Sequence, residues 1–183
     1  MFYAIQGLIT HKEPTFVVLK TQGGVSYALS VSLFTSSKLE KGAQIELLTT
    51  PIFKEDSQRL FGFLEKSEQQ MFELLLKVNG IGASIAMAVC STLDSNAFYK
   101  ALSTGDENAF KSVPGIGAKV AKRIITELSD KKVSLSLSDD GKTQALQALI
   151  TLGFKQEKAL EALSKCESKE VSALVKEALK RLS

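Results

Sequence analysis

The 183-residue chain combines 44% hydrophobic residues with a nearly balanced charge, since 23 Lys and Arg against 20 Asp and Glu give a net charge of +3. This composition is typical of a globular protein with a sizeable core. It excludes a polycation that coats nucleic acid indiscriminately, so any anion binding must be local.

Histidine and cysteine are too scarce to predict metal or nucleophile chemistry. The chain has one histidine and two cysteines, and the cysteines form no CxxC motif. We therefore expect no metal, no cofactor and no catalytic residue. Cys90 and Cys166 are interpreted as reduced thiols that pack in a core.

The N-terminal residues, MFYAIQGLIT, have neither a basic segment nor a small-residue cleavage site. No run of apolar residues approaches the roughly 18 that a membrane span requires. The sequence therefore indicates neither a secretory signal peptide nor a membrane anchor, and we expect a cytoplasmic protein.

Residues 1–64 have the pattern of short strands. Segments rich in Val, Ile, Leu, Phe and Tyr are separated by turn signals such as Gly23-Gly24 and Glu40-Lys41-Gly42. Five strands in so short a segment predict an OB-like β-barrel, a fold that often binds nucleic acid. The expected strands are FYAIQGLIT, TFVVLKT, VSYALSVS, AQIELLTT and QRLFGFL.

Residues 65–129 change to the composition of helices. The segment KSEQQMFELLLKV has apolar residues at helical spacing and Ser67 as its predicted N-cap. The segment that follows this domain, DKKVSLSLSDDG, is rich in serine and charge and lacks aromatic residues. It predicts a flexible linker over residues 130–141.

Residues 142–183 predict a small three-helix, UBA-like domain. The helices are expected to break at Leu152-Gly153-Phe154 and at Cys166-Glu167-Ser168, and the last one carries an apolar stripe. The predicted fold class is therefore α+β multidomain: a barrel, an all-α domain, a linker and a three-helix domain.

One motif occurs twice: VNGIGASIAMAV begins at Val78 and VPGIGAKVAKRI begins at Val113. Each copy predicts two helices joined by a Gly-Ile-Gly turn, with the isoleucine pointing inward. Glycine permits left-handed turn geometry and leaves the N–H groups at a helix start open to a phosphate oxygen. The alternative is that these glycines are only helix C-caps. The candidate phosphate-binding residues are Gly80, Ile81, Gly82, Gly115, Ile116 and Gly117, with Lys119, Lys122 and Arg123 adding charge beside the second turn.

The glycine turns do not have the context of a nucleotide pocket, since a Rossmann fingerprint or a P-loop needs other residues around them. Seven cations and seven anions between Glu65 and Ser129 leave the domain neutral. One copy of the chain should therefore bind DNA weakly and in a salt-sensitive way. Oligomerisation would sum several such contacts.

The doubled motif resembles a tandem helix-hairpin-helix, which straddles the minor groove of duplex DNA and contacts its backbone without a base code. With the barrel, linker and tail in this order, the whole chain resembles the RuvA family of Holliday-junction branch migration proteins. FKEDSQRLFGF, LLKVNGIG and VPGIGAKVAKRIITEL carry the resemblance. It implies a non-catalytic subunit that recognises four-way junctions and holds them open in DNA recombination, DNA repair and the SOS response.

The resemblance also gives a role to Glu55 and Asp56, which by themselves read as a polar hairpin tip. It implies that they form an acidic pin, which repels strand phosphates at the crossover. It further implies a homotetramer, sometimes paired into an octamer, that works with the hexameric ATPase RuvB and with the resolvase RuvC where that is present.

RuvB is expected to bind the C-terminal domain, where each apolar residue could serve the core instead of a docking face. The candidates are Leu149, Leu152, Phe154, Leu174 and Leu179. The first hairpin differs from the second, because Ala83 and Ser84 stand where such motifs often carry a basic residue.

Two other function classes remain open from the residues alone. A helix-hairpin-helix DNA glycosylase would place a catalytic Asp some twenty residues after the hairpin, where Asp139 and Asp140 occur. They lie in a polar segment with no apolar pocket or aromatic wedge, which argues against base flipping. A pure protein-interaction scaffold would leave the repeated Gly-Ile-Gly turn unexplained.

Overall fold

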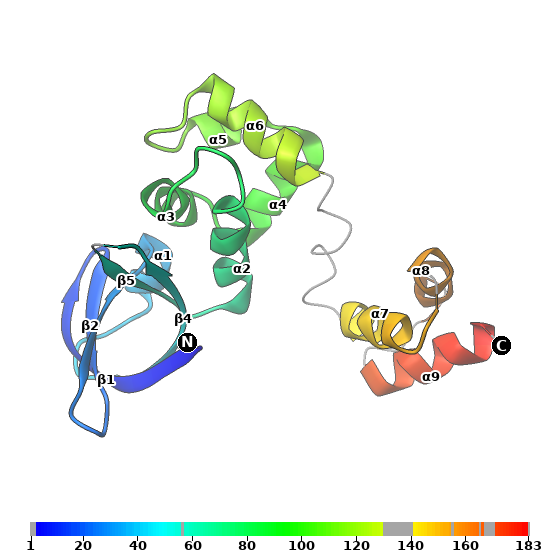
Figure 1. The fold of residues 1–183 in the computed structure, drawn as a ribbon, viewed down its shortest axis with the longest axis horizontal. Coiled ribbons are helices and arrows are strands. Elements are labelled where there is room, and N and C mark those ends of the chain that lie inside the picture. The colour runs from blue at the N-terminus through cyan, green and yellow to red at the C-terminus, as the bar shows by residue number, and fades with distance from the viewer. Residues whose placement is uncertain are drawn as a thin grey trace. The chain divides into compact units, whose positions relative to one another are not determined.

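The computed structural model describes residues 3–55, 57–129, 141–154, 156–164, 166 and 171–182. The chain divides into two compact units, Met1–Ser129 and Asp130–Ser183. The first unit contains a barrel of strands followed by helices, and the second contains helices alone (Figure 1). The predicted α+β organisation is confirmed.

Five strands close into a barrel in the first unit, as the sequence predicts. They neighbour one another in the order β1-β2-β3-β5-β4, with β3 and β5 parallel and the other pairs antiparallel. Alternate side chains of β1 point inward, so Ile5 and Ile9 are buried. The strands are β1 (Ala4–Glu13), β2 (Phe16–Lys20), β3 (Ser26–Ser30), β4 (Gln44–Phe53) and β5 (Gln58–Phe63).

A short helix, α1 (Leu33–Ser37), follows β3 at a place where the sequence pattern predicts none. Ser32 is its N-cap, and the Ser32 Oγ accepts a hydrogen bond from the Thr35 N–H at 3.0 Å. A helix of five residues is too short to show apolar periodicity, which is why the pattern missed it.

The helices after the barrel in the first unit begin with α2 (Lys66–Leu75). Its N-cap is Glu65, so the prediction that Ser67 caps this helix is wrong. Ser67 lies inside the first turn, because the backbone is extended at Glu65 and turns helical immediately after it. The helices that follow are α3 (Ala83–Thr92), α4 (Ser95–Thr104), α5 (Glu107–Lys111) and α6 (Ala118–Ser129).

Phe72 of α2 joins the barrel to these helices. Its ring packs against Phe61 and Phe63 of β5, with centroid separations of 4.9 and 5.2 Å. All three side chains are fully buried, so their apolar area stabilises the contact between the barrel and α2. Because α2 leads into the first Gly-Ile-Gly turn, this packing sets the position of that turn relative to the barrel.

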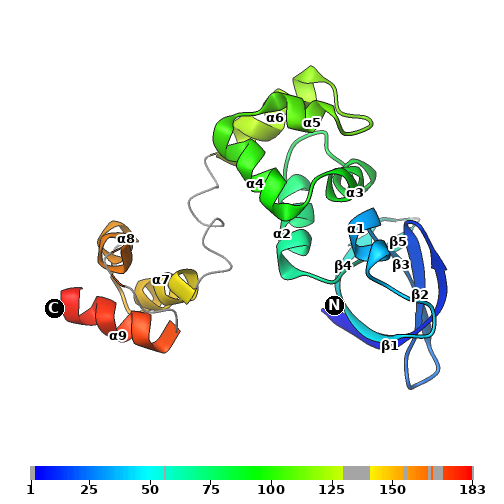
Figure 2. The ribbon, with the colours of Figure 1, turned by 180° about the vertical axis from the view of Figure 1, so that it is seen from behind.

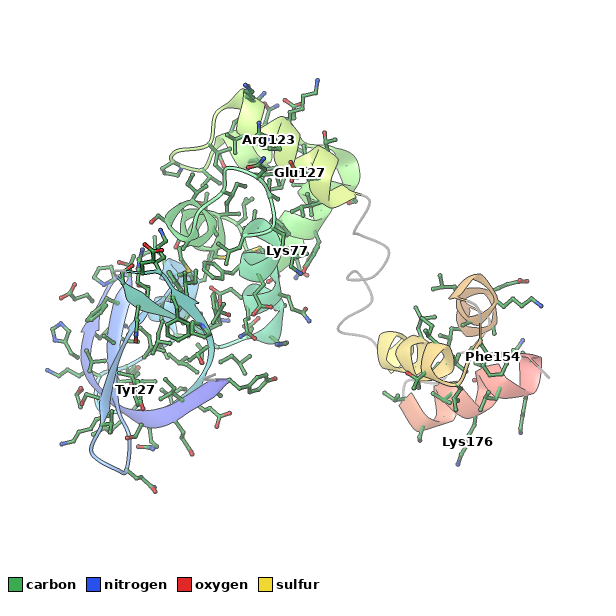
Figure 3. All side chains as sticks on the ribbon, in the orientation of Figure 1. Tyr27, Lys77, Arg123, Glu127, Phe154 and Lys176 are labelled. Carbon is green, nitrogen blue, oxygen red and sulfur yellow. The ribbon has the colours of Figure 1, made fainter. Side chains whose placement is uncertain are left out.

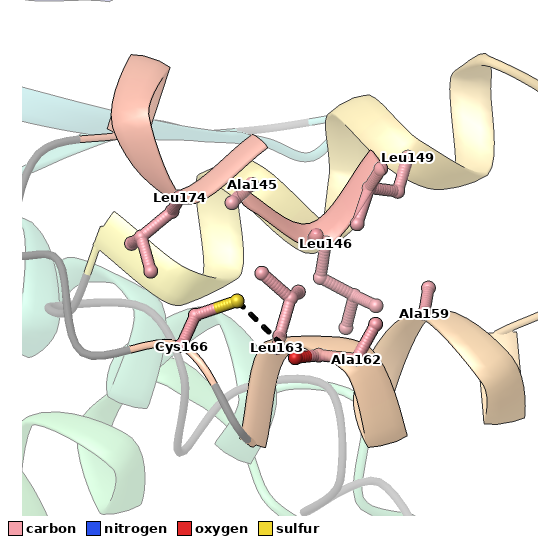
Figure 4. Close-up of a cluster of buried hydrophobic side chains, with 9 residues drawn as sticks. Ala145, Leu146, Leu149, Ala159, Ala162, Leu163, Cys166 and Leu174 are labelled. Carbon is pink, nitrogen blue, oxygen red and sulfur yellow. Dashed lines mark hydrogen bonds between the residues drawn. The ribbon is translucent and has the colours of Figure 1, made fainter. Parts of the chain in front are cut away.

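The second unit contains α7 (Gly141–Thr151), α8 (Gln156–Ser164) and α9 (Val171–Leu182). The predicted break at residues 152–154 is confirmed, with Gly153 at a φ of +92°. Cys166 is buried in the core of this unit, where its Sγ bonds to the Ala162 carbonyl at 3.2 Å (Figure 4). The predicted linker at 130–141 lies outside the described residues except for Gly141, which is the first residue of α7 and not part of a linker. Glu167-Ser168 also lie outside the described residues.

Candidate nucleic-acid interface

The two Gly-Ile-Gly turns, at residues 78–82 and 113–117, have the same backbone geometry. Gly80 and Gly115 adopt positive φ values of +83° and +87°. Residues with a side chain rarely adopt this left-handed conformation, so glycine is required at both positions. The repeat in the sequence is therefore a repeat in three dimensions.

Ile81 and Ile116 fill the interior behind the turns, as the sequence predicts. Each side chain is only 6% exposed. Each also donates its main-chain N–H to the carbonyl of the valine three residues earlier, Val78 or Val113, at 3.1 Å. The buried isoleucine thus anchors the turn in the core, while its neighbouring glycines stay at the surface.

Gly82 and Gly117 leave the start of the following helix open. A Cβ placed on either would meet no atom within 4 Å. Gly82 caps α3 in an extended conformation and forms no side-chain cap hydrogen bond. The first N–H groups of a helix have no partner within it and carry partial positive charge. Each turn therefore presents donors to solvent in the arrangement that suits a phosphate.

The candidate cations beside the second turn do not share one environment. Lys119 and Lys122 are exposed on α6. Arg123 is only partly exposed, and its Nη1 donates to the Asn79 carbonyl at 2.9 Å. Figure 3 shows Arg123 and Glu127 on α6, and Glu127 also contacts Asn79. Sequence reasoning missed Asn79 and Glu127.

The tip of the β4–β5 hairpin carries Glu55, which is exposed. The strands pair as far as Phe53 and Gln58, and the Lys54 N–H then donates to the Ser57 carbonyl at 2.8 Å to close the tip. Asp56, the other predicted pin residue, lies outside the described residues. Both the α5–α6 turn and this tip project toward the left of the first unit in Figure 1 and toward its right in Figure 2.

Glu68 of α2 forms a buried polar contact with α1. Its carboxylate accepts hydrogen bonds from the hydroxyls of Ser32 and, at 2.6 Å, Thr35. Burial raises the pKa of Glu68, while the two hydroxyl hydrogen bonds oppose that rise. Gln69 adds a hydrogen bond from its Nε2 to the Thr49 carbonyl at 3.1 Å. These contacts add to the packing of Phe72 against Phe61 and Phe63, which joins the barrel to α2.

The predicted docking residues of the second unit divide between core and surface. Leu149 and Leu174 are fully buried in its apolar core (Figure 4). Phe154 and Leu179 are partly buried and pack against that core. Leu152 differs from all four, because its side chain is 59% exposed.

The described ranges also bear on thiol, metal and membrane chemistry. Cys90 is buried, and burial raises the pKa of its thiol, which keeps it protonated. Within those ranges, no group of three or more His, Cys, Asp and Glu side chains could hold a metal ion. Nor does any helix there have both the length and the apolar character of a membrane span. Asp139 and Asp140 lie outside the described residues.

Known protein families match the barrel, the helical domain that follows it and the C-terminal domain. Residues 1–62 match the family described as RuvA N terminal domain, residues 72–130 match the SAM-like Helix-hairpin-helix tandem, and residues 140–183 match the RuvA, C-terminal domain. The chain is 59% identical to the Holliday junction branch migration complex subunit RuvA of Campylobacter lari, 58% to that of Campylobacter curvus and 51% to that of Campylobacter hominis. Each match covers 100% of both chains. The chain therefore belongs to the RuvA family.

Proposed function

We propose that the chain is a non-catalytic, structure-selective DNA-binding subunit that recognises four-way junctions and holds them open for branch migration in recombination and repair. The observation that carries this proposal is the repeated turn, with its buried isoleucine and its open glycines. Two donor clusters of the same kind in one unit suit the two backbones of one duplex arm. The names of the full-length relatives support the same function.

Each turn binds a DNA phosphate through the N–H groups that follow Gly82 or Gly117. Lys119 and Lys122 add side-chain charge at the second turn. The first turn depends on its main-chain donors, because Ala83 and Ser84 carry no charge. Since phosphates look alike at every base pair, such contacts position the DNA without reading its sequence. The selectivity must therefore come from shape.

The β4–β5 hairpin supplies that shape selectivity. Glu55 and Asp56 place negative charge where a continuous duplex would bring its phosphates, which disfavours the duplex. At a junction the strands diverge at the crossover, and the same charges keep them apart. Repulsion of the wrong ligand is an economical route to specificity, because the attractive contacts are common to both DNA forms.

Assembly makes these weak contacts sufficient. The helical domain carries no net charge, so one copy of the chain has little general attraction for DNA. A homotetramer presents one pair of turns to each arm of the junction and gathers four acidic tips at its centre. A second tetramer on the opposite face would form the octamer. Linked contacts multiply the affinity of the separate ones.

The second unit recruits the hexameric ATPase RuvB, which supplies the force for migration, and the resolvase RuvC acts on the same junction. Leu152 is the docking residue of choice among the five predicted, because it is exposed while Leu149 and Leu174 fill the core. An exposed leucine at the end of α7 fits an apolar pocket on a partner.

A reconstituted strand-exchange assay tests this function. The purified chain, the ATPase and ATP should release a labelled arm from a synthetic four-way junction, and neither protein alone should do so at the same concentration. Leu152→Asp should abolish release but leave junction binding intact, whereas Val25→Asp, at an exposed site of the barrel, should have no effect. Release that does not depend on the chain would contradict the proposal.

A further inference from the structure

Helix α6 of the second hairpin holds the turn of the first hairpin through Asn79. We propose that Arg123 and Glu127 are positioning residues, which fix the distance between the two phosphate-binding turns so that both meet their phosphates together. In this role Arg123 is not itself a phosphate ligand. The inference rests on the proposed function, because it assumes that both turns bind DNA.

Both main-chain polar groups of Asn79 are engaged by α6. Arg123 Nη1 donates to the Asn79 carbonyl at 2.9 Å, and the Asn79 N–H donates to Glu127 Oε2 at 3.2 Å. Arg123 and Glu127 are four residues apart, so they project from the same face of the helix. Two bonds to one peptide segment fix its orientation as well as its position, which a single bond would not.

The difference between the two copies of the motif matches this arrangement. The first copy reads VNGIG and the second reads VPGIG, so Asn79 stands where the second copy has Pro114. Proline has no N–H to donate. Only the first copy can therefore be held by an acidic side chain in this way. The difference between Asn79 and Pro114 thus matches the hydrogen bond that Glu127 makes to the first turn.

Gly80 contributes a second requirement besides its positive φ. A Cβ on Gly80 would lie 3.1 Å from Arg123 Nη1, whereas a Cβ on Gly115 would meet no atom within 4 Å. The first turn therefore has a bare backbone partly because the guanidinium approaches it closely. The equivalent position in the second turn faces open space.

Apart from this contact, the negative charge of Glu127 is unfavourable for DNA binding by α6. A carboxylate on the helix that carries Lys119 and Lys122 lowers the attraction of that helix for DNA. If its effect were only electrostatic, its removal would tighten binding. If it positions the first turn, its removal weakens binding although a negative charge is lost. The two roles thus predict changes of opposite sign.

The test compares Glu127→Ala, Glu127→Gln and the charge control Glu107→Ala in the full chain, with a synthetic four-way junction as the probe. Glu107 pairs with Lys111 within α5 and makes no contact with Asn79, so its removal changes the net charge by the same amount and leaves the Asn79 contact intact. We expect Glu127→Ala to weaken binding by roughly tenfold, the scale of one hydrogen bond to a charged group. Glu127→Gln keeps an acceptor oxygen for the Asn79 N–H and should restore the affinity. Equal or tighter binding by Glu127→Ala would overturn the proposal.

Hydrogen exchange of the Asn79 amide, measured without DNA, tests the contact by itself. The amide should be protected in the natural chain and in Glu127→Gln, and it should exchange faster in Glu127→Ala while neighbouring core amides stay protected. An Asn79 amide unchanged in Glu127→Ala would overturn the contact. A natural chain that fails to bind the junction contradicts the proposed function instead, and this exchange experiment still decides the contact.

A double-mutant cycle identifies the turn through which Glu127 acts. Gly82→Val obstructs the first turn and Gly117→Val obstructs the second. The effect of Glu127→Ala on junction affinity should disappear in the Gly82→Val background and persist in the Gly117→Val background. Equal effects in the two backgrounds would show general destabilisation and would overturn the positioning role.

Arg123→Met provides an independent variant. A phosphate ligand contributes about 0.9 to the slope of log affinity against log salt. As a positioning residue, Arg123 can be replaced with a loss of affinity and no change of that slope. A slope that falls by the full contribution of one phosphate would make Arg123 a ligand and contradict the proposal.

Discussion

The guanidinium of Arg123 donates to the main-chain carbonyl of Asn79 at 2.9 Å, across 44 positions of the sequence. Arg123 belongs to the second copy of the helix-hairpin-helix and Asn79 to the first, so this bond joins the two copies directly. When two binding sites are held at a fixed spacing, binding at the first raises the effective concentration of the ligand at the second. The proposed two-point contact with DNA therefore depends on the rigidity of this pair.

Valine at Gly117 or Gly82 should weaken junction binding without unfolding the chain. Both positions are open, so the side chain fits the fold but stands in the path of the phosphate. The expected loss is about 2 kcal/mol, the scale of a hydrogen bond to a charged group. Titration with labelled junction measures the loss, and circular dichroism confirms the fold.

Gly23→Val is the matched control, because Gly23 is equally exposed in the β2–β3 turn. Gly115→Val is a poorer test, since the φ of +87° at Gly115 means that valine there would also strain the turn. Folded Gly82 and Gly117 variants with the natural affinity would refute the open-backbone argument.

Alanine at Lys119 and at Lys122 should reduce the salt dependence of binding. Each exposed lysine that neutralises a phosphate contributes about 0.9 to the slope of log affinity against log salt. Affinity for junction and duplex should fall together, because the contacts read no bases. Lys41→Ala in the barrel serves as the control. An unchanged slope in both α6 variants would remove these lysines from the interface.

Charge reversal at the hairpin tip should relax selectivity. Glu55→Lys with Asp56→Lys replaces repulsion by attraction, so binding to a linear duplex should improve more than binding to a junction. The ratio of the two affinities is the quantity to measure. Glu40→Lys with Glu46→Lys changes the net charge equally, in the turn before β4 and near the start of that strand, and should leave the ratio unchanged. A charge-reversed tip that keeps the natural ratio would refute the pin assignment.

Glu68 should make the stability of the first unit depend on pH. Its pKa is raised above 4.5 by burial, so the folded state binds the proton more tightly than the unfolded chain does. Its contribution therefore favours folding at low pH and is lost as pH rises from about 4.5 through the raised pKa. Urea midpoints measured across this range should decline in the natural chain relative to Glu68→Gln. Parallel curves for the two proteins would contradict the raised pKa.

The strands and the turns could be predicted from the sequence because their signals are local. Alternating apolar residues specify a strand such as β1, and Gly80 and Gly115 mark left-handed turns wherever the chain folds. The short helix α1 could not be predicted, since one turn carries no periodicity. The N-cap prediction at Ser67 was wrong because the chain leaves β5 extended as far as Glu65 and becomes helical at Lys66, and this path overrides the local preference of serine for caps.

The role of Arg123 could not be read from its position in the motif. As a cation next to the proposed phosphate site it resembles Lys119 and Lys122, and a pattern of charges does not distinguish them. The difference depends on a partner in the other copy of the motif. The sequence signal for this contact is that the first copy has Asn79 where the second has Pro114. The signal can be interpreted only from the structure, in which Glu127 accepts a hydrogen bond from the Asn79 N–H.

A band-shift titration of the full chain measures its preference for a four-way junction. A synthetic four-way junction and a linear duplex of equal length are compared at fixed magnesium and moderate salt. Junction recognition predicts discrete, slowly migrating complexes with the junction and an affinity preference of about tenfold or more, which corresponds to about 1.4 kcal/mol. Equal affinity for the two DNAs, or no binding to either, would contradict junction recognition and leave the repeated turn as a general backbone contact or a packing device.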